Sequence, residues 1–89
     1  MTHVTALPFV QAQENGQPTS LWDVTPSGVW SADNDTGGAY ADALISHMAA
    51  TAQPILLGLV MKAIMDAGTW TGLECGFCHR IAGATLRAA

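Results

Sequence analysis

The stretch 54–67 is apolar on almost every side, and this feature constrains the fold most. Its interior is interrupted only by Gly58, Lys62 and Asp66, one residue in every four. A helix of this kind is either the central helix of a core or is covered by another subunit. A chain of 89 residues offers little material to surround a helix. We therefore predict a helix here and a homodimer formed through it. The residues expected at the interface are Leu57, Val60, Met61 and Trp70.

Residues 20–33 carry the pattern of a β-hairpin. Pro26 suits position i+1 of a type I turn because its φ is already near −65°, and Gly28 suits the left-handed residue that closes a short hairpin loop. Apolar and polar residues alternate around this turn. One face of the hairpin would hold Trp22, Val24, Trp30 and Ala32. An isolated hairpin is marginal in water, so we expect this face to dock on the rest of the chain.

Two further helices are predicted from apolar residues that recur at helical spacing. The expected fold class is therefore α+β and mainly α, in a single small domain over 1–89. An irregular arm over 1–19 would be anchored by Leu7 and Phe9. The hairpin over 20–33 would follow, packed on three helices over about 37–52, 54–67 and 71–87.

Three glycines, Gly72, Gly76 and Gly83, lie on one strip of the third predicted helix. Each interior glycine costs up to about 1 kcal/mol relative to alanine. Their alignment indicates a close approach to this strip by a neighbouring helix or by a ligand, and we favour the helix.

Charge is sparse and unevenly distributed. Charged residues make up 11% of the chain, and the net charge is −4. Residues 1–53 hold five acidic residues and no Lys or Arg, whereas residues 54–89 hold three basic and two acidic ones, so the two parts carry −5 and +1. The first part should repel phosphate backbones and the second has too few cations for a basic stripe, so we do not expect a nucleic-acid partner.

The start of the chain lacks a basic segment followed by an apolar run, and no apolar run is long enough to span a membrane. A cytoplasmic protein without membrane contact is therefore expected.

The sharpest local motif is Cys75-Gly76-Phe77-Cys78-His79. This C-x-x-C-H order places two thiols one helical turn apart, where they can bond the two vinyl groups of haem, beside a histidine that can bind the iron. The five residues resemble the attachment motif of c-type cytochromes, in particular cytochrome c′, which carries it late in a helical bundle. The resemblance implies an electron-transfer protein with haem c held by Cys75, Cys78 and His79. The distal iron ligand would then come from Met48, Met61, Met65 or His47.

The same motif also has interpretations without haem. In a cytoplasmic protein two thiols remain reduced, and packed helical cysteines that bind no cofactor are the interpretation we favour. The motif could also form a redox-active dithiol or a zinc site, and zinc would need His47 or His3 to complete the set of Cys75, Cys78 and His79. His47 lies off the main apolar face of its helix, so a position at the solvent edge is expected.

No arrangement of side chains typical of a catalytic centre emerges from the sequence. We therefore expect a non-enzymatic interaction or structural module that binds a second copy or another protein and needs no cofactor. Two different functions compete with this one: the haem protein described above, and a nucleic-acid-binding domain in which the second and third helices would form a helix-turn-helix.

Overall fold

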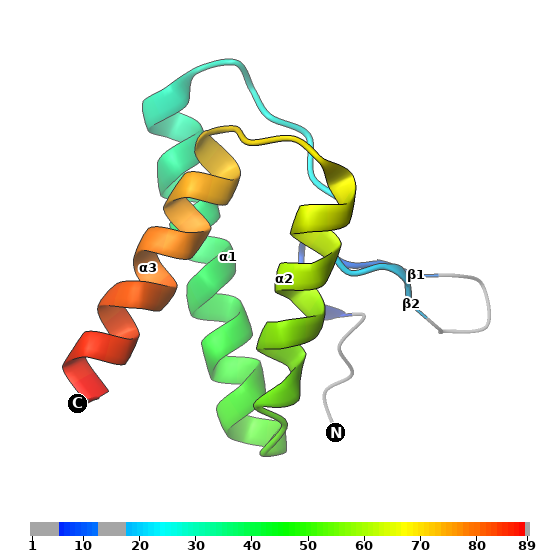
Figure 1. The fold of residues 1–89 in the computed structure, drawn as a ribbon, viewed down its shortest axis with the longest axis vertical. Coiled ribbons are helices and arrows are strands. Elements are labelled where there is room, and N and C mark those ends of the chain that lie inside the picture. The colour runs from blue at the N-terminus through cyan, green and yellow to red at the C-terminus, as the bar shows by residue number, and fades with distance from the viewer. Residues whose placement is uncertain (1–5, 13–17, 89) are drawn as a thin grey trace.

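Three α-helices form most of the chain in the computed structural model, which describes residues 6–12 and 18–88 (Figure 1). Helix α1 spans Trp30–Thr51, α2 spans Ile55–Ala67 and α3 spans Gly72–Ala88. The three predicted helices are thus confirmed, although α1 begins at Trp30, seven residues earlier than expected. Two short strands, β1 (Gln11–Ala12) and β2 (Pro18–Ser20), pair antiparallel with Gln11 opposite Ser20. This pair of strands is too small to form a layer of its own, so the fold is a mainly helical domain of three helices.

The predicted hairpin over 20–33, and with it the α+β class, is wrong. Residues 22–29 form no strand, and Trp30–Asp33 are the first residues of α1. The chain bends at Gly28, whose φ is 90°, but the bend leads into a helix. The Asp33 carboxylate accepts the backbone N–H groups of Ser27 at 2.9 Å and Gly28 at 3.3 Å. A carboxylate at the start of a helix also suits its positive end, so Asp33 favours the helix over a second strand.

Helices α1 and α3 pack closely because glycines on each helix face the backbone of the other. A Cβ atom on Gly37 would lie 2.0 Å from the carbonyl oxygen of Leu73, and one on Gly76 would lie 1.9 Å from that of Asn34. Gly72 meets the carbonyl oxygen of Trp30 in the same way. The predicted close approach is therefore confirmed at Gly72 and Gly76.

The third predicted position, Gly83, does not belong to that contact, because a Cβ there would have no neighbour within 4 Å. Beyond the glycines, Arg80 on α3 pairs with Asp42 on α1 at 2.8 Å. This ion pair connects the same two helices at the protein surface.

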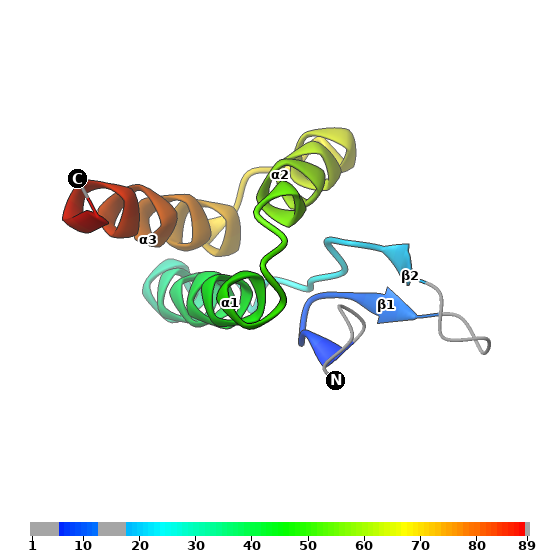
Figure 2. The same cartoon turned by 90° about the horizontal axis from the view of Figure 1, so that it is seen from below.

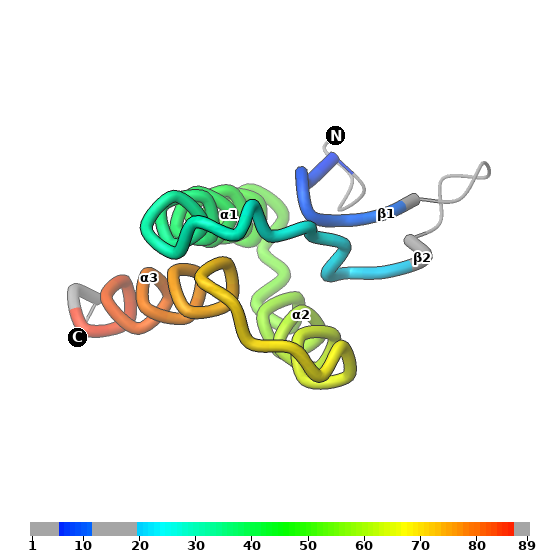
Figure 3. The backbone as a smooth tube through the Cα atoms, turned by 90° about the horizontal axis from the view of Figure 1, so that it is seen from above, coloured from blue at the N-terminus to red at the C-terminus, as the bar shows by residue number. Residues whose placement is uncertain are grey.

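Helix α2 lies further from both other helices, and the N-terminal segment fills the space beneath it. Figures 2 and 3 show α1 and α3 side by side, with β1 and β2 beside α1 on the side away from α3. The contact between α2 and the rest of the chain is therefore made by side chains.

An aromatic group lies in the core. The ring centroid of Phe9 lies 5.4 Å from that of Trp22 and 6.0 Å from that of Phe77. Tyr40 of α1 completes this aromatic group at 5.4 Å from Phe9.

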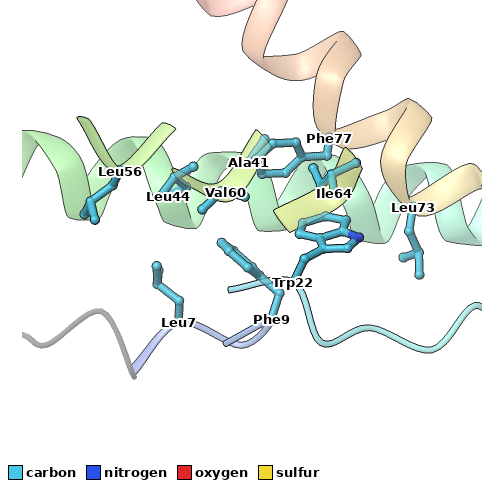
Figure 4. Close-up of a cluster of buried hydrophobic side chains, with 10 residues drawn as sticks. All are labelled: Leu7, Phe9, Trp22, Ala41, Leu44, Leu56, Val60, Ile64, Leu73 and Phe77. Carbon is cyan, nitrogen blue, oxygen red and sulfur yellow. The ribbon is translucent and has the colours of Figure 1, made fainter. Parts of the chain in front are cut away.

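The apolar core draws on every helix and on the N-terminal segment (Figure 4). Leu7 and Phe9 are both buried, which confirms them as the residues that anchor this segment. Parts of the predicted arm, residues 1–5 and 13–17, lie outside the described residues. No helix in the described part of the chain has the length and apolar character needed to cross a membrane. The core consists of Leu7, Phe9, Trp22, Ala41, Leu44, Leu56, Val60, Ile64, Leu73 and Phe77.

Candidate functional site

Helix α2 buries one stripe and leaves its opposite side uncovered. It follows Pro54 and ends at Gly68, whose φ of 72° suits glycine and whose N–H donates to the carbonyl of Met65 at 3.2 Å. Its buried residues are Leu56, Val60 and Ile64, one every fourth position. This spacing places them on one side of the helix, within the cluster of buried side chains in Figure 4.

The opposite side of α2 carries large apolar side chains in water. Ile55 and Met65 are each 70% exposed and Leu59 is 43% exposed. Lys62 and Asp66 form an exposed ion pair at 2.7 Å, and the hydrogen bond to Asp66 together with its charge raises the pKa of Lys62. We call this side the uncovered face of α2; it consists of Ile55, Gly58, Leu59, Lys62, Met65 and Asp66.

The four residues predicted at an interface lie in different surroundings. Val60 is fully buried in the core of its own chain. Leu57 and Met61 are half-buried and pack against that core. Trp70 is 60% exposed in the loop between α2 and α3. Ile55, Leu59 and Met65 were missed because a helix that is apolar all round does not reveal which side is buried.

The cysteines of the C-x-x-C-H motif lie on α3 as free, half-buried thiols. Cys78 packs against the core, and burial, with smaller contributions from Cys75 and Glu74, raises its pKa. His79 is exposed, while Met48 lies on α1, half-buried against the core. Haem, zinc and redox activity remain predictions from the sequence.

Metal-ligating groups are not gathered elsewhere in the described residues. No cluster of three or more His, Cys, Asp or Glu side chains suited to a metal ion occurs within 6–12 and 18–88. His3, named above as a zinc ligand, lies outside these ranges. His47 is buried rather than at the solvent edge, and its Nδ1 atom has no hydrogen-bond partner among the described residues. The reason is its place on the side of α1 that includes buried Leu44, one turn earlier.

The buried acid Glu74 joins the start of α3 to the N-terminal segment. Its carboxylate accepts two hydrogen bonds from Thr71, one from the backbone N–H and one from the hydroxyl at 2.7 Å. The Thr71 hydroxyl in turn accepts the backbone N–H of Leu73 at 3.2 Å. Together these bonds form a capping box at the start of α3. It also accepts the indole N–H of Trp22 at 2.8 Å. Burial alone would raise the pKa of Glu74, but the hydrogen bonds from Thr71 and Trp22 outweigh burial and lower it. With its oxygens so engaged, Glu74 fits a structural role.

A cleft of about 340 Å³ lies between β2 and α2, lined by Ser20, Leu21, Trp22, Ala63, Asp66 and Ala67. Its two polar side chains are already engaged: the Ser20 hydroxyl accepts the backbone N–H of Trp22, and Asp66 pairs with Lys62. The cleft therefore presents a mixed polar and apolar surface whose hydroxyl and carboxylate groups are already engaged.

Comparison of the chain with protein-family models, with curated proteins and with solved structures gave no match. The function must therefore be inferred from the residues and their geometry alone.

Proposed function

We propose that this chain is a small non-enzymatic interaction module that forms a homodimer through the uncovered face of α2. The observation that supports the proposal is the exposure of Ile55, Leu59 and Met65 along one side of a single helix. Scattered exposed apolar residues are ordinary, but apolar residues that share one helix face are typical of an interaction site.

Charge favours a second copy as the partner. The net charge of −4 lies entirely outside α2, because Lys62 and Asp66 cancel within it. Two acidic copies can therefore approach each other through α2 with the least electrostatic repulsion. A basic partner would instead be attracted to the acidic residues elsewhere in the chain.

Size predicts that this dimer is weak. A helix of 13 residues is about 20 Å long, so a contact made by α2 alone falls below about 1,200 Å² in total, at the low end of specific interfaces. We expect a dissociation constant between about 10 μM and 1 mM.

A charge placed on the uncovered face tests the proposal. Leu59→Glu should abolish association because an unpaired carboxylate would be buried in the interface. Ser46→Glu adds the same charge at an exposed position of α1 and is the matched control. Translational diffusion measured by NMR over a concentration series should slow for the natural chain and for Ser46→Glu, and remain that of a monomer for Leu59→Glu. Equal association of both variants would overturn the proposal.

A further inference from the structure

We infer that the second copy crosses α2 at Gly58, with the two α2 helices antiparallel and their backbones in close contact. This inference rests on the proposed homodimer and specifies its geometry.

Gly58 has no role within its own chain that requires glycine. It is exposed in the interior of α2, and its φ is not in the left-handed region, where among the described glycines only Gly28 and Gly68 lie. A Cβ there would meet nothing within 4 Å. A helical glycine of this kind destabilises its helix relative to alanine without any gain in packing inside the chain.

Three other helical glycines of this chain lie at contacts between helix backbones. At each of Gly37, Gly72 and Gly76, a Cβ atom would lie within 3 Å of a backbone atom of the opposite helix, and together these glycines permit the close packing of α1 on α3. At Gly58 the space that a Cβ would fill is instead empty, and it opens outward on the uncovered face, next to Leu59 and one turn from Ile55. A second helix that crosses at Gly58 could place its own Leu59 in this gap.

Gly83, the other helical glycine with open space, lacks these surroundings. Its neighbours one turn earlier, His79 and Arg80, are polar and exposed, and Arg80 is already held by Asp42 of α1. Gly58 is instead flanked by Ile55 and Leu59, and the nearest charge, Lys62, is paired with Asp66. The exposed apolar residues beside Gly58 therefore favour Gly58 over Gly83.

The ion pair also indicates the direction of packing. In a parallel pair each Lys62 would face the Lys62 of the other copy. In an antiparallel pair that crosses at Gly58 the two lysines lie on opposite sides of the crossing, eight residues and so about 12 Å apart along the helix axis. Antiparallel packing also aligns the two helix dipoles favourably.

Substitution of Gly58 tests the crossing point because it should act in opposite directions on the monomer and the dimer. In dilute solution Gly58→Ala should raise the melting temperature by about 4–8 °C, since it removes the cost of a helical glycine. The same change should weaken association at least about tenfold, and Gly58→Leu more, because both copies then carry a side chain at the contact. Gly83→Ala is the matched control, with raised stability and unchanged association.

Engineered disulfides test the direction of packing. In a Cys75→Ala, Cys78→Ala background, Gly58→Cys should cross-link to its own counterpart under mild oxidation, whereas Lys62→Cys should not. Cross-linking at Lys62→Cys with none at Gly58→Cys would overturn the antiparallel crossing.

The two proposals can fail separately. If the natural chain dimerises and Gly58→Leu dimerises equally well, the crossing at Gly58 is wrong and the homodimer stands. If the natural chain stays monomeric at every concentration, the homodimer itself is wrong, and the crossing with it.

Discussion

Alanine at Gly76 should destabilise the protein although alanine is the better helix former. Helix propensity alone predicts that Gly76→Ala stabilises by about 1 kcal/mol. The new Cβ would, however, lie 1.9 Å from the carbonyl oxygen of Asn34 and 2.7 Å from its carbonyl carbon. Cβ contacts shorter than 3.0 Å essentially never occur, so α1 and α3 would have to separate by at least the 1.1 Å difference between 1.9 and 3.0 Å.

Separation of the helices would loosen the whole contact rather than a single residue. Gly37 and Gly72 lie in the same contact, each with a backbone atom of the other helix closer than 3.0 Å to its Cβ position. Overpacking typically costs about 1–3 kcal/mol, and the backbone here cannot yield as a side-chain end could. The upper end of this range, less the roughly 1 kcal/mol that alanine gains as the better helix former, leaves a net loss of about 2 kcal/mol, which for a domain of this size lowers the melting temperature by about 8–16 °C.

Thermal unfolding followed by circular dichroism measures this loss. Gly83→Ala is the matched control on the same helix, and it should raise the melting temperature by about 4–8 °C because its Cβ meets nothing within 4 Å. If Gly76→Ala were as stable as Gly83→Ala, the close contact between α1 and α3 would be refuted.

The remaining predictions concern the buried acids, the tryptophan and the thiols. The folded-state pKa values of Glu74 and Asp33 are lowered, so their contribution to stability is complete above their unfolded pKa values, near pH 4–4.5, and is lost as the pH falls through the folded values. Glu74→Gln should therefore reduce the dependence of the melting temperature on pH between pH 2 and 6. An unchanged dependence would count against this role of Glu74. Trp22→Phe should cost about 1–3 kcal/mol in chemical denaturation, because it removes the donor to a buried carboxylate oxygen of Glu74; a cost near zero would mean that this hydrogen bond is unimportant. Cys78, whose pKa is raised by burial, should react with iodoacetamide more slowly than an unstructured cysteine peptide at pH 8, as mass spectrometry of the digested protein would show; equal rates would contradict its packing against the core.

The positions of the three helices could be predicted from sequence because their signals are local. Apolar spacing, Pro54 and Gly68 determine where α2 begins and ends. Thr71 and Glu74 also form a capping pair that can be read from sequence. The bond from Trp22 to Glu74 joins residues 52 positions apart, and no local pattern predicts it.

The hairpin was mispredicted because two local signals compete over the same residues. The chain does bend at Gly28, but the Asp33 carboxylate binds the N–H groups of Ser27 and Gly28 and so holds this bend against the start of α1. Alternation placed Trp22 and Trp30 on one face, whereas Trp22 is buried and Trp30 is 56% exposed. A tertiary contact of Trp22 with Phe9 and Phe77, not strand pairing, decides this difference.

The candidate interface could be assigned to a helix from sequence but not to a side of it. Nearly every side of α2 is apolar, so only the fold reveals that Val60 is buried and Leu59 uncovered. The glycine strip on α3 was informative for a related reason. Gly72 and Gly76 contact α1, whereas Gly83, on the same strip, lies beyond the place where the two helices meet.

Sedimentation equilibrium of the unmodified chain tests the central claim most directly. We predict that the weight-average mass rises from 9.3 kDa in dilute solution toward that of a dimer as the concentration increases from about 10 μM to 1 mM. A mass that stays at 9.3 kDa throughout this range would contradict the proposal that α2 is covered by a second copy.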